Sequence, residues 1–181
     1  MKKIVIIGAN DFQNQLILKA KEMGFETHVF AWQDGSIGER TADYFYPVSI
    51  VEIDEILEKC KEIKPDAVAT IASDLANITV SKVAAGLGLP GNTPECIEIS
   101  TNKYAMRSAF LKAGIPTPAF YKVDQVQDEL YKMKLPVIVK PTDRSGRRAI
   151  TKITDFKDLE GAIQDAVEQS FEKKAIVEEY I

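Results

Sequence analysis

The stretch VIVKPTDRSGRRAITKI, from Val137 to Ile153, decides the fold of the second half of the chain. Its two ends, PVIVK (136–140) and AITKI (149–153), are rich in β-branched residues and therefore predict strands. Only a short bend separates them, so the two strands must pair as an antiparallel hairpin.

The bend of this hairpin concentrates positive charge. Arg144, Arg147 and Arg148 surround Gly146, and Lys140 precedes them, in a chain whose net charge is −4. Glycine adopts backbone angles closed to other residues, so neighbouring N–H groups can converge on an anion, and arginines donate to phosphate oxygens. The bend is therefore a candidate phosphate site. Taken alone, the pattern fits a solvated surface turn better.

Lys103 adds independent support for a phosphate site. It lies in the first turn of a helix predicted at 102–113, where the helix dipole repels a cation by about 0.3–1 kcal/mol. A phosphate docked at that helix end would reverse the sign of the interaction. The other interpretation is a lysine that extends into solvent.

The run IVEEYI (176–181) places one acid between apolar residues. In a strand Ile176, Glu178 and Tyr180 share a face, because side chains alternate. An apolar slot with one hydrogen-bond acceptor suits an adenine, whose amino group donates. The alternative is an edge strand with two solvated glutamates.

Outward from the hairpin, the second half predicts an α+β lobe. AFYKV (119–123) reads as a strand, and Asp124 with Gln127 forms a capping box that predicts a helix after it. Apolar residues keep helical spacing across 159–171, and 175–181 is a last strand.

In the first half, strands alternate with helices. Strands are predicted at 2–8, 27–31, 44–48 and 67–72, with helices at 16–23, 53–60 and 78–87. This alternation predicts an α/β fold with a doubly wound parallel sheet. LPGNTPE (89–95) marks a boundary, so we expect a Rossmann-like domain at 1–95, linking helices at 96–118 and the incomplete α+β lobe at 119–181.

Composition narrows the class of protein. Residues 1–96 carry a net charge of −5 and residues 97–181 a net charge of +1, so neither half has the basic excess of a nucleic-acid-binding protein. The early apolar run is too short for a signal peptide or a membrane span. Cys60 and Cys96 give no disulfide framework or metal-ligand spacing. We expect a soluble cytoplasmic protein without nucleic-acid or membrane partners, in which His28 is structural.

The common nucleotide motifs are missing. No G-x-x-x-x-G-K-[ST] occurs, and GANDFQ (8–13) supplies only Gly8 of the three glycines in the dinucleotide fingerprint. A nicotinamide-dependent oxidoreductase is therefore the weaker alternative. Ser73 and Asp74 follow a strand at the edge where open α/β sheets bind ligands, which makes them candidate substrate residues. Asp74 could equally cap a helix.

Together these features resemble the ATP-grasp superfamily, in particular its carbamoyl-phosphate-synthase-like members. The resemblance spans nearly the whole chain. Its carriers are KIVIIGANDFQ, ASDLA, GLGLPGN, STNKYAMRSAFLKAGIPTP, VIVKPTDRSG and IVEEYI. It implies a pre-ATP-grasp domain at residues 1–95, followed by the first lobe of the ATP-grasp domain.

The resemblance also implies which residues bind ATP. Two lysines would hold the phosphates, the bend at 143–149 would close over them, and one glutamate would accept from the adenine amino group. The implied set is Lys103, Lys140, Ser145, Gly146, Arg147, Glu178, Tyr180 and Ile181. The family bend carries more small residues than this one, which has Arg147, Arg148 and Ala149.

The implied reaction is phosphorylation of a carboxylate or bicarbonate by ATP, then attack by an amine or ammonia on the acyl phosphate. Magnesium would neutralise the transferring phosphoryl group. Its ligands would come from a second lobe beyond Ile181, so we expect no catalytic residue and no metal ligand in this chain, and no turnover by the chain alone. It would be the front part of a longer enzyme, truncated or encoded as a split subunit, with a homodimer or the other subunit as its assembly. A non-catalytic nucleotide-binding or regulatory module is the remaining alternative.

Overall fold

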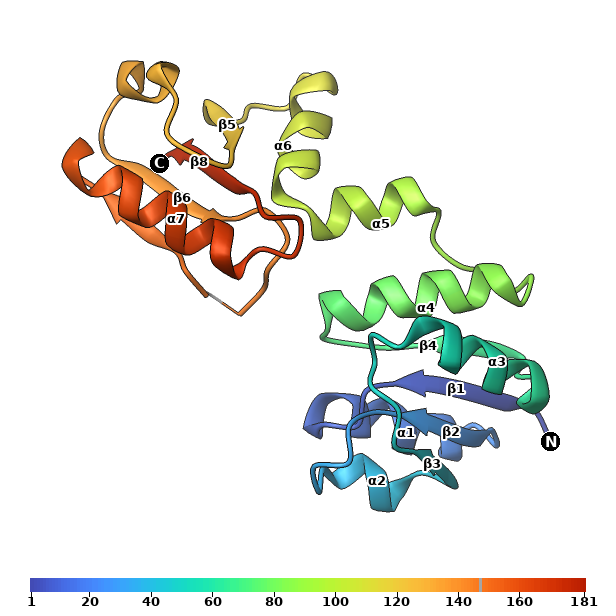
Figure 1. Ribbon diagram of the computed structural model, residues 1–181. Helices are drawn as coiled ribbons and strands as arrows, with labels where there is room; N and C mark the ends of the chain where they lie inside the picture. Colours follow the sequence, from blue (N-terminus) through green and yellow to red (C-terminus); the bar gives the residue numbers. More distant parts are fainter. Residues whose placement is uncertain (147) are drawn as a thin grey trace. The chain divides into compact units, whose positions relative to one another are not determined.

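The computed structural model describes residues 1–146 and 148–181. The chain forms two compact units, Met1–Ile97 and Glu98–Ile181, and each is described by itself (Figure 1). Helix α5 (Pro94–Thr101) contains the division between them.

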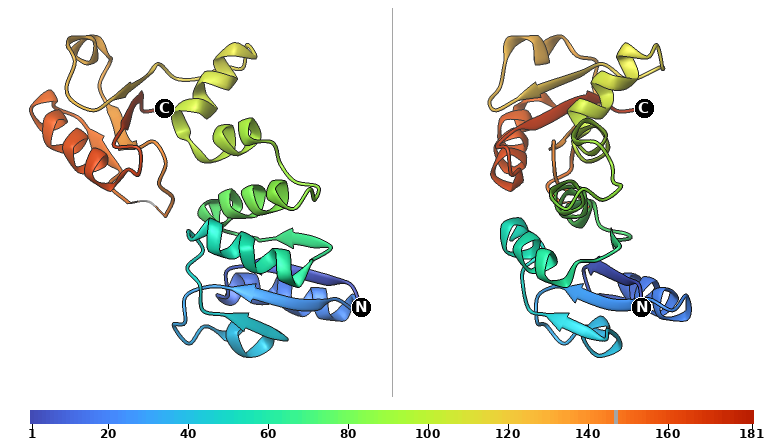
Figure 2. Two further views of the ribbon diagram at one scale, coloured as in Figure 1. Left: turned by 45° about the vertical axis from the view of Figure 1, so that its right-hand side comes forward. Right: turned by 90° about the vertical axis from the view of Figure 1, so that its right-hand side faces the viewer.

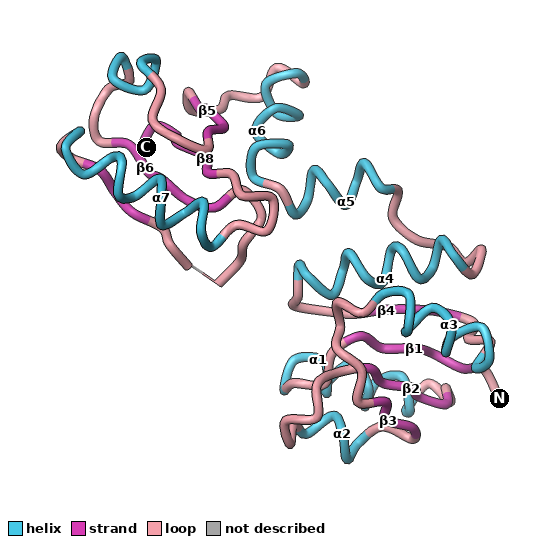
Figure 3. The backbone as a smooth tube through the Cα atoms, viewed as in Figure 1, coloured by secondary structure: helices cyan, strands magenta, loops and turns pink. Residues whose placement is uncertain are grey.

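The first unit alternates strands and helices around one parallel sheet (Figure 3). The strand order is β3-β2-β1-β4, and every neighbouring pair is parallel. In chain order its elements are β1 (Lys3–Ile7), α1 (Asp11–Glu22), β2 (Glu26–Phe30), α2 (Ile37–Thr41), β3 (Tyr44–Tyr46), α3 (Ile53–Ile63), β4 (Ala67–Ala69) and α4 (Asp74–Gly86).

Helices cover both faces of this sheet, because alternate residues of β1 point to opposite sides. Val5 and Ile7 pack with α3 and α4 through residues such as Ile56. Ile4 and Ile6 pack with α1 on the other face. A continuous apolar strand is therefore buried on both sides, as the run KIVII predicts.

The second unit is built on an antiparallel sheet. Its strand order is β5-β8-β6-β7, with every neighbouring pair antiparallel. In chain order its elements after α5 are α6 (Lys103–Lys112), β5 (Phe120–Val123), the 3-10 helix η1 (Asp128–Lys132), β6 (Val137–Pro141), β7 (Thr151–Ile153), the 3-10 helix η2 (Phe156–Asp158), α7 (Leu159–Gln169) and β8 (Ala175–Glu179).

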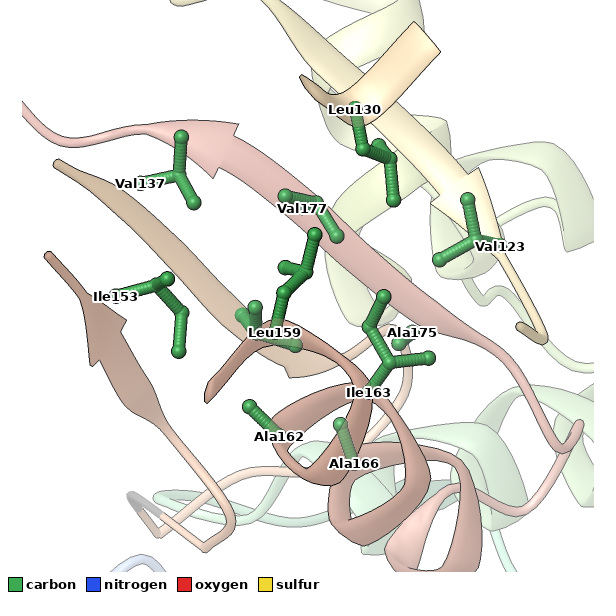
Figure 4. Packing of buried hydrophobic residues seen from close by; sticks show 11 residues of the cluster. Val123, Leu130, Val137, Ile153, Leu159, Ala162, Ile163, Ala166, Ala175 and Val177 are labelled. Carbon is green, nitrogen blue, oxygen red and sulfur yellow. The ribbon is translucent and has the colours of Figure 1, made fainter. Parts of the chain in front are cut away.

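One face of the antiparallel sheet packs against α7. Leu159 and Ile163 of α7 meet Val137, Val177 and Ile153 from the strands in one buried cluster (Figure 4). Full burial of an aliphatic side chain stabilises a fold by about 1.5–3 kcal/mol. This cluster is therefore the main source of stability for the unit.

The other face of the antiparallel sheet lies toward α6. Figure 2 shows α7 and α6 on opposite sides of the strands. The contacts agree, because Val177 of β8 packs with α7 while its neighbour Glu178 bonds to Arg107 of α6. The two sides differ in chemistry: the α7 side is apolar, and the α6 side carries charge.

The expected fold class is confirmed: a parallel doubly wound sheet is followed by an antiparallel α+β unit. The helix expected after Asp124 is wrong, because only η1 forms there. Asp124 forms an ion pair with Lys174 rather than capping a helix. The edge-strand alternative for 176–181 is also wrong, because β8 lies between β5 and β6. The domain limits at 95 and 118 stay predictions.

Candidate functional site

The α6 side of the antiparallel sheet is a cationic face. Residues directly opposite each other on neighbouring antiparallel strands point to the same side, and so do alternate residues of one strand. The pairings of Glu178 with Phe120 and Ile138, and of Ile138 with Lys152, therefore define one row across the sheet. The next row on the same side holds Lys122, Ile176 and Lys140. The strands thus give this face three lysines and one carboxylate.

Glu178 lies at the centre of the cationic face. Its side chain is 5% exposed, and it forms an ion pair with Lys140, whose side chain is 16% exposed. The two residues come from neighbouring strands: Glu178 lies opposite Ile138, and Lys140 is two residues further along β6 on the same face. A buried carboxylate needs charged or hydrogen-bonding partners, because desolvation of an unpaired charge is costly. Lys140 supplies the first of these.

Arg107 of α6 supplies the second partner. Its Nε donates to Oε2 of Glu178 at 2.9 Å, and its Nη2 donates to Oε1 at 3.3 Å. The Arg107 side chain is 27% exposed. Sequence reasoning did not select Arg107. The available signal was its spacing, because residues four apart share a helix face and Arg107 follows Lys103 by four.

The charge state of Glu178 follows from these contacts. Burial of the carboxyl raises its pKa, but the hydrogen bonds and charges of Arg107 and Lys140 outweigh burial and hold the pKa below its usual value of 4.5. Glu178 is therefore ionised at neutral pH and acts only as an acceptor. One anion lies between two cations, so this cluster retains an excess of positive charge.

Apolar surfaces flank the Glu178 carboxylate. Phe120 and Ile138 lie beside it across the sheet, and the buried Ile176 precedes it on the same side of β8. Tyr104 of α6 meets the Phe120 ring edge-on, with centroids 5.5 Å apart. A groove of about 690 Å³ opens beside this pair, lined by Tyr104, Leu111 and Phe120 among others, but it does not include Lys140 or Glu178. We place the candidate site at the charged cluster, where acceptor and cations meet.

Lys103 lies at the other end of the same helix face, against the hairpin bend. Its backbone N–H donates to the Thr142 carbonyl at 2.7 Å, and its Nζ donates to the Arg144 carbonyl. Asn102 caps α6 by accepting from Tyr104 and Ala105. The N-terminus of α6 is therefore bonded to Thr142 and Arg144, at the start of the bend. Lys140 lies two residues before Thr142, so both lysines flank the start of the bend.

The bend itself is tethered to the end of α7. The Asp143 carboxylate accepts from the backbone N–H groups of Phe171 and Glu172 at 3.0 and 2.7 Å. Arg144 donates to the Gln169 carbonyl at 2.6 Å, and its guanidinium lies 4.0 Å from the centre of the Phe171 ring. Arg144 thus helps to hold the bend in place.

The two residues that follow Arg144 in the bend, Ser145 and Gly146, are open to solvent. Gly146 has a φ of +77°, in the left-handed region that glycine adopts at little cost. A side chain at Gly146 would meet no atom within 4 Å, so the reason for glycine here is conformational. The prediction for Arg147 lies outside the described residues.

The C-terminal residues of the implied site lie at the end of β8. Tyr180 donates its backbone N–H to the Pro136 carbonyl at 3.2 Å, and Lys152 Nζ lies 3.7 Å from the centre of its ring. Tyr180 and Ile181 are both exposed. Their expected role at the base stays a prediction.

The other candidates have structural contacts. Ser73 caps α4 by accepting from the Ala76 N–H at 3.2 Å, and Asp74 is the first residue of that helix. Both lie in the first unit, and their role as substrate residues stays a prediction. His28 is buried in β2, bonded to Glu26 and Tyr46.

Across residues 1–146 and 148–181, no group of three or more His, Cys, Asp or Glu side chains is arranged to hold a metal ion. None of the helices in the same described ranges is both long enough and apolar enough to cross a membrane.

Sequence comparison finds relatives along the whole chain, although no family model matches. The chain is 24% identical over 187 residues to a formate-dependent phosphoribosylglycinamide formyltransferase of Prochlorococcus marinus, covering 99% of this chain and 48% of the relative. It is 24% identical over 202 residues to the C-terminal section of a carbamoyl phosphate synthase large chain of Methanocaldococcus jannaschii, covering 99% and 32%. The chain thus spans about half or less of these curated relatives.

Solved structures share the fold of both units. An L-amino acid ligase from Bacillus licheniformis matches with a TM-score of 0.82 at 23% identity, covering 100% of this chain and 44% of that one. The biotin carboxylase domain of a Hydrogenobacter thermophilus 2-oxoglutarate carboxylase, crystallised as a dimer with MgADP, ADP and bicarbonate, matches with a TM-score of 0.80 at 20% identity, covering 99% and 44%.

Proposed function

We propose that this chain, whose sequence relatives and structural neighbours are ATP-grasp enzymes, binds ATP on the cationic face of its antiparallel sheet. It would do so as part of a ligase. That ligase activates a carboxylate or bicarbonate as an acyl phosphate, which an amine or ammonia then attacks.

The observation that carries the proposal is the charge balance of the cationic face. Lys122, Lys140 and Lys152 from the strands and Arg107 from α6 share this side with the buried Glu178. Glu172 lies 4.0 Å from Lys122 at the border of the face. The remaining excess of positive charge, beside an apolar row with one acceptor, suits a ligand with an anionic end and a flat base that donates.

The lysines have donors to offer an anion. A lysine ammonium has three N–H groups, and Lys140 uses one for Glu178. Lys103 is the first residue of α6, at the end where the helix dipole favours a phosphate. We assign Lys103 and Lys140 to the phosphates and Glu178 to the adenine amino group. Ser145 and Gly146 would close over the phosphates, with Tyr180 and Ile181 beside the base. Arg147 stays a prediction.

Magnesium would accompany the ATP phosphates. When bound, it would neutralise charge on the transferring phosphoryl group. The residues of the cationic face are cations and one paired carboxylate, so they suit the phosphates rather than the metal. The chain's own part is to bind and orient the nucleotide.

The oxidoreductase alternative has no support. The relatives and neighbours are ligases and carboxylases. In addition, the Gln13 side chain lies against Gly8, 3.0 Å from where a Cβ would stand, in the turn that would have to admit a pyrophosphate.

Equilibrium binding of ATP, AMP and NADH to the 181-residue chain tests the proposal. We expect ATP to bind more tightly than AMP, and the substitutions Lys103→Met and Lys140→Met to lower ATP affinity by about tenfold each, as for the loss of one charge-assisted contact. Lys112→Met, at the far end of α6, is the matched control and should bind ATP normally. Saturable NADH binding that ATP does not displace, or equal affinity for ATP in all variants, would overturn the proposal.

A further inference from the structure

Arg107 holds Glu178 in a way that Lys140 does not. Its guanidinium contacts both carboxylate oxygens, through Nε to Oε2 and Nη2 to Oε1. Two parallel contacts from a planar fork fix the plane of the carboxylate as well as its position. Lys140 forms its ion pair with Oε1 alone, so it leaves that plane undetermined.

The charge state of Glu178 decides which bases it can accept. An ionised carboxylate has only acceptors, whereas a protonated one also donates. Adenine presents an amino group at the position where hypoxanthine and guanine present a carbonyl oxygen. A carboxylate that faces this position therefore accepts from the adenine amino group when it is ionised and repels the carbonyl oxygen of the other two bases. The protonated form would lose this discrimination.

Burial works against the ionised form. Glu178 is almost inaccessible to water, and burial favours the neutral carboxyl group. Lys140 opposes this in the ligand-free structure, but phosphate oxygens compete for its ammonium when ATP binds. Arg107 is not assigned to the phosphates, so it is the partner that remains with Glu178 throughout binding.

From this geometry we propose that Arg107 is a positioning residue, which keeps the Glu178 carboxylate oriented and accepting and thereby selects adenine over hypoxanthine. The inference rests on the proposed ATP site and names what sets its base specificity.

The other two lysines that the strands place on this face contact aromatic rings. From β5, Lys122 lies 4.9 Å from the centre of the Tyr104 ring of α6. From β7, Lys152 lies over the ring of Tyr180, which follows β8. In the described part of the chain the ion-pair partners of Glu178 are Lys140 and Arg107, so neither of these two lysines replaces Arg107 in orienting it.

The test compares binding of ATP and inosine triphosphate between pH 5.5 and 8.5 for the unchanged chain, Arg107→Met, Arg107→Lys and Lys112→Met. We expect the unchanged chain and Lys112→Met to prefer ATP throughout this range. Arg107→Met should lose about tenfold or more in ATP affinity, the scale of one contact to a charged group. Its preference for ATP over inosine triphosphate should also shrink as the pH falls. Arg107→Lys keeps a positive charge but cannot form the two parallel contacts of the guanidinium. Compared with Arg107→Met, it should recover the pH profile of the base preference more fully than the affinity for ATP.

A second measurement needs no nucleotide. The carbon-13 carboxyl resonance of Glu178, followed against pH, should titrate at higher pH in Arg107→Met than in the unchanged chain. Thermal unfolding shows whether Arg107→Met is folded. If it is not, the ATP affinity of Arg107→Lys decides the matter, because a lysine cannot form both contacts and this variant should bind ATP more weakly than Lys112→Met does.

The outcomes separate the inference from the proposed function. Absence of ATP binding by the unchanged chain removes both. ATP binding with the same base preference and pH profile in folded Arg107→Met leaves the function standing but overturns the inference. Where only Arg107→Lys folds, an ATP affinity equal to that of Lys112→Met has the same meaning. Either result shows that Arg107 merely fastens α6 to the sheet.

Discussion

Replacing Glu178 by glutamine tests the charge arrangement of the cationic face through stability alone. The substitution keeps the shape of the side chain but removes its charge. It also places an amide N–H₂ where one carboxylate oxygen now accepts, against a donor of Arg107 or Lys140. Both cations are then left without their anion in a site where their side chains are 27% and 16% exposed.

The size of the effect follows from these contacts. Loss of one partner from a buried set of charged hydrogen bonds costs about 1–3 kcal/mol, and full burial of the broken pair would raise that to about 3–5 kcal/mol. The two cations retain some access to water, so we expect about 2 kcal/mol. For a unit of this size that corresponds to a fall in melting temperature of about 8–16 °C.

The pH dependence identifies the source. The pKa of Glu178 is lower in the folded chain than its ordinary value of 4.5, so the unfolded chain binds this proton more tightly. The stability that Glu178 contributes is therefore present above about pH 4.5 and is lost as the pH falls through its lowered pKa. Glu178→Gln lacks that loss, so the difference in unfolding free energy should shrink below pH 4.5.

Denaturant unfolding between pH 3 and 8, monitored by circular dichroism, measures both effects. Glu160→Gln, on the exposed side of α7, is the matched control and should differ from the unchanged chain by less than about 0.5 kcal/mol. Equal stability of Glu178→Gln and the unchanged chain at pH 7, or a difference that does not vary with pH, would refute the reasoning.

Two further predictions concern the first unit and the linking helix. Burial raises the pKa of the Cys60 thiol to about 12, whereas Cys96 is exposed. Iodoacetamide at pH 8 should therefore label one cysteine in the native chain and two in denaturant, as counted by mass spectrometry. A doubly labelled native chain would contradict this prediction. Burial raises the pKa of Asp43, but hydrogen bonds from Lys21 and Thr27 outweigh it and lower the pKa to about 2. Asp43→Asn should therefore lose about 1–3 kcal/mol of unfolding free energy at neutral pH, with the loss fading as the pH falls from 3.8 toward 2, and a loss that persists at pH 2 would show another cause.

Periodicity was sufficient to predict most elements, because each strand or helix buries a face whose residues recur at a fixed interval. The run KIVII is buried on both sides, and the apolar residues of α7 meet the sheet as their spacing predicts. The capping-box pattern at Asp124 failed for a local reason. The Asp124 carboxylate forms an ion pair with Lys174, 50 residues away, and does not cap a helix.

The burial of the two glutamates in β8 could not be predicted from the sequence of that strand alone. Two adjacent glutamates suggest an exposed edge, yet Glu178 is buried and Glu179 is not. The difference comes from sheet order. β8 is paired on both sides, so the fate of each glutamate depends on which helix covers its face. Strand order is a property of the whole unit, and no window of residues around 178 contains it.

Arg107 shows the same limit for the site. Lys103 and Lys140 were predicted from neighbouring signals, a helix start and a strand end. The contact between Arg107 and Glu178 joins residues 71 apart and requires α6 to lie on the sheet face opposite α7. Once that face is fixed, the chemistry follows: a buried carboxylate needs cationic partners, and the covering helix brings Arg107 in addition to the Lys140 that the neighbouring strand supplies. The residue that sets the charge state of the site is therefore found by asking what compensates the buried acid.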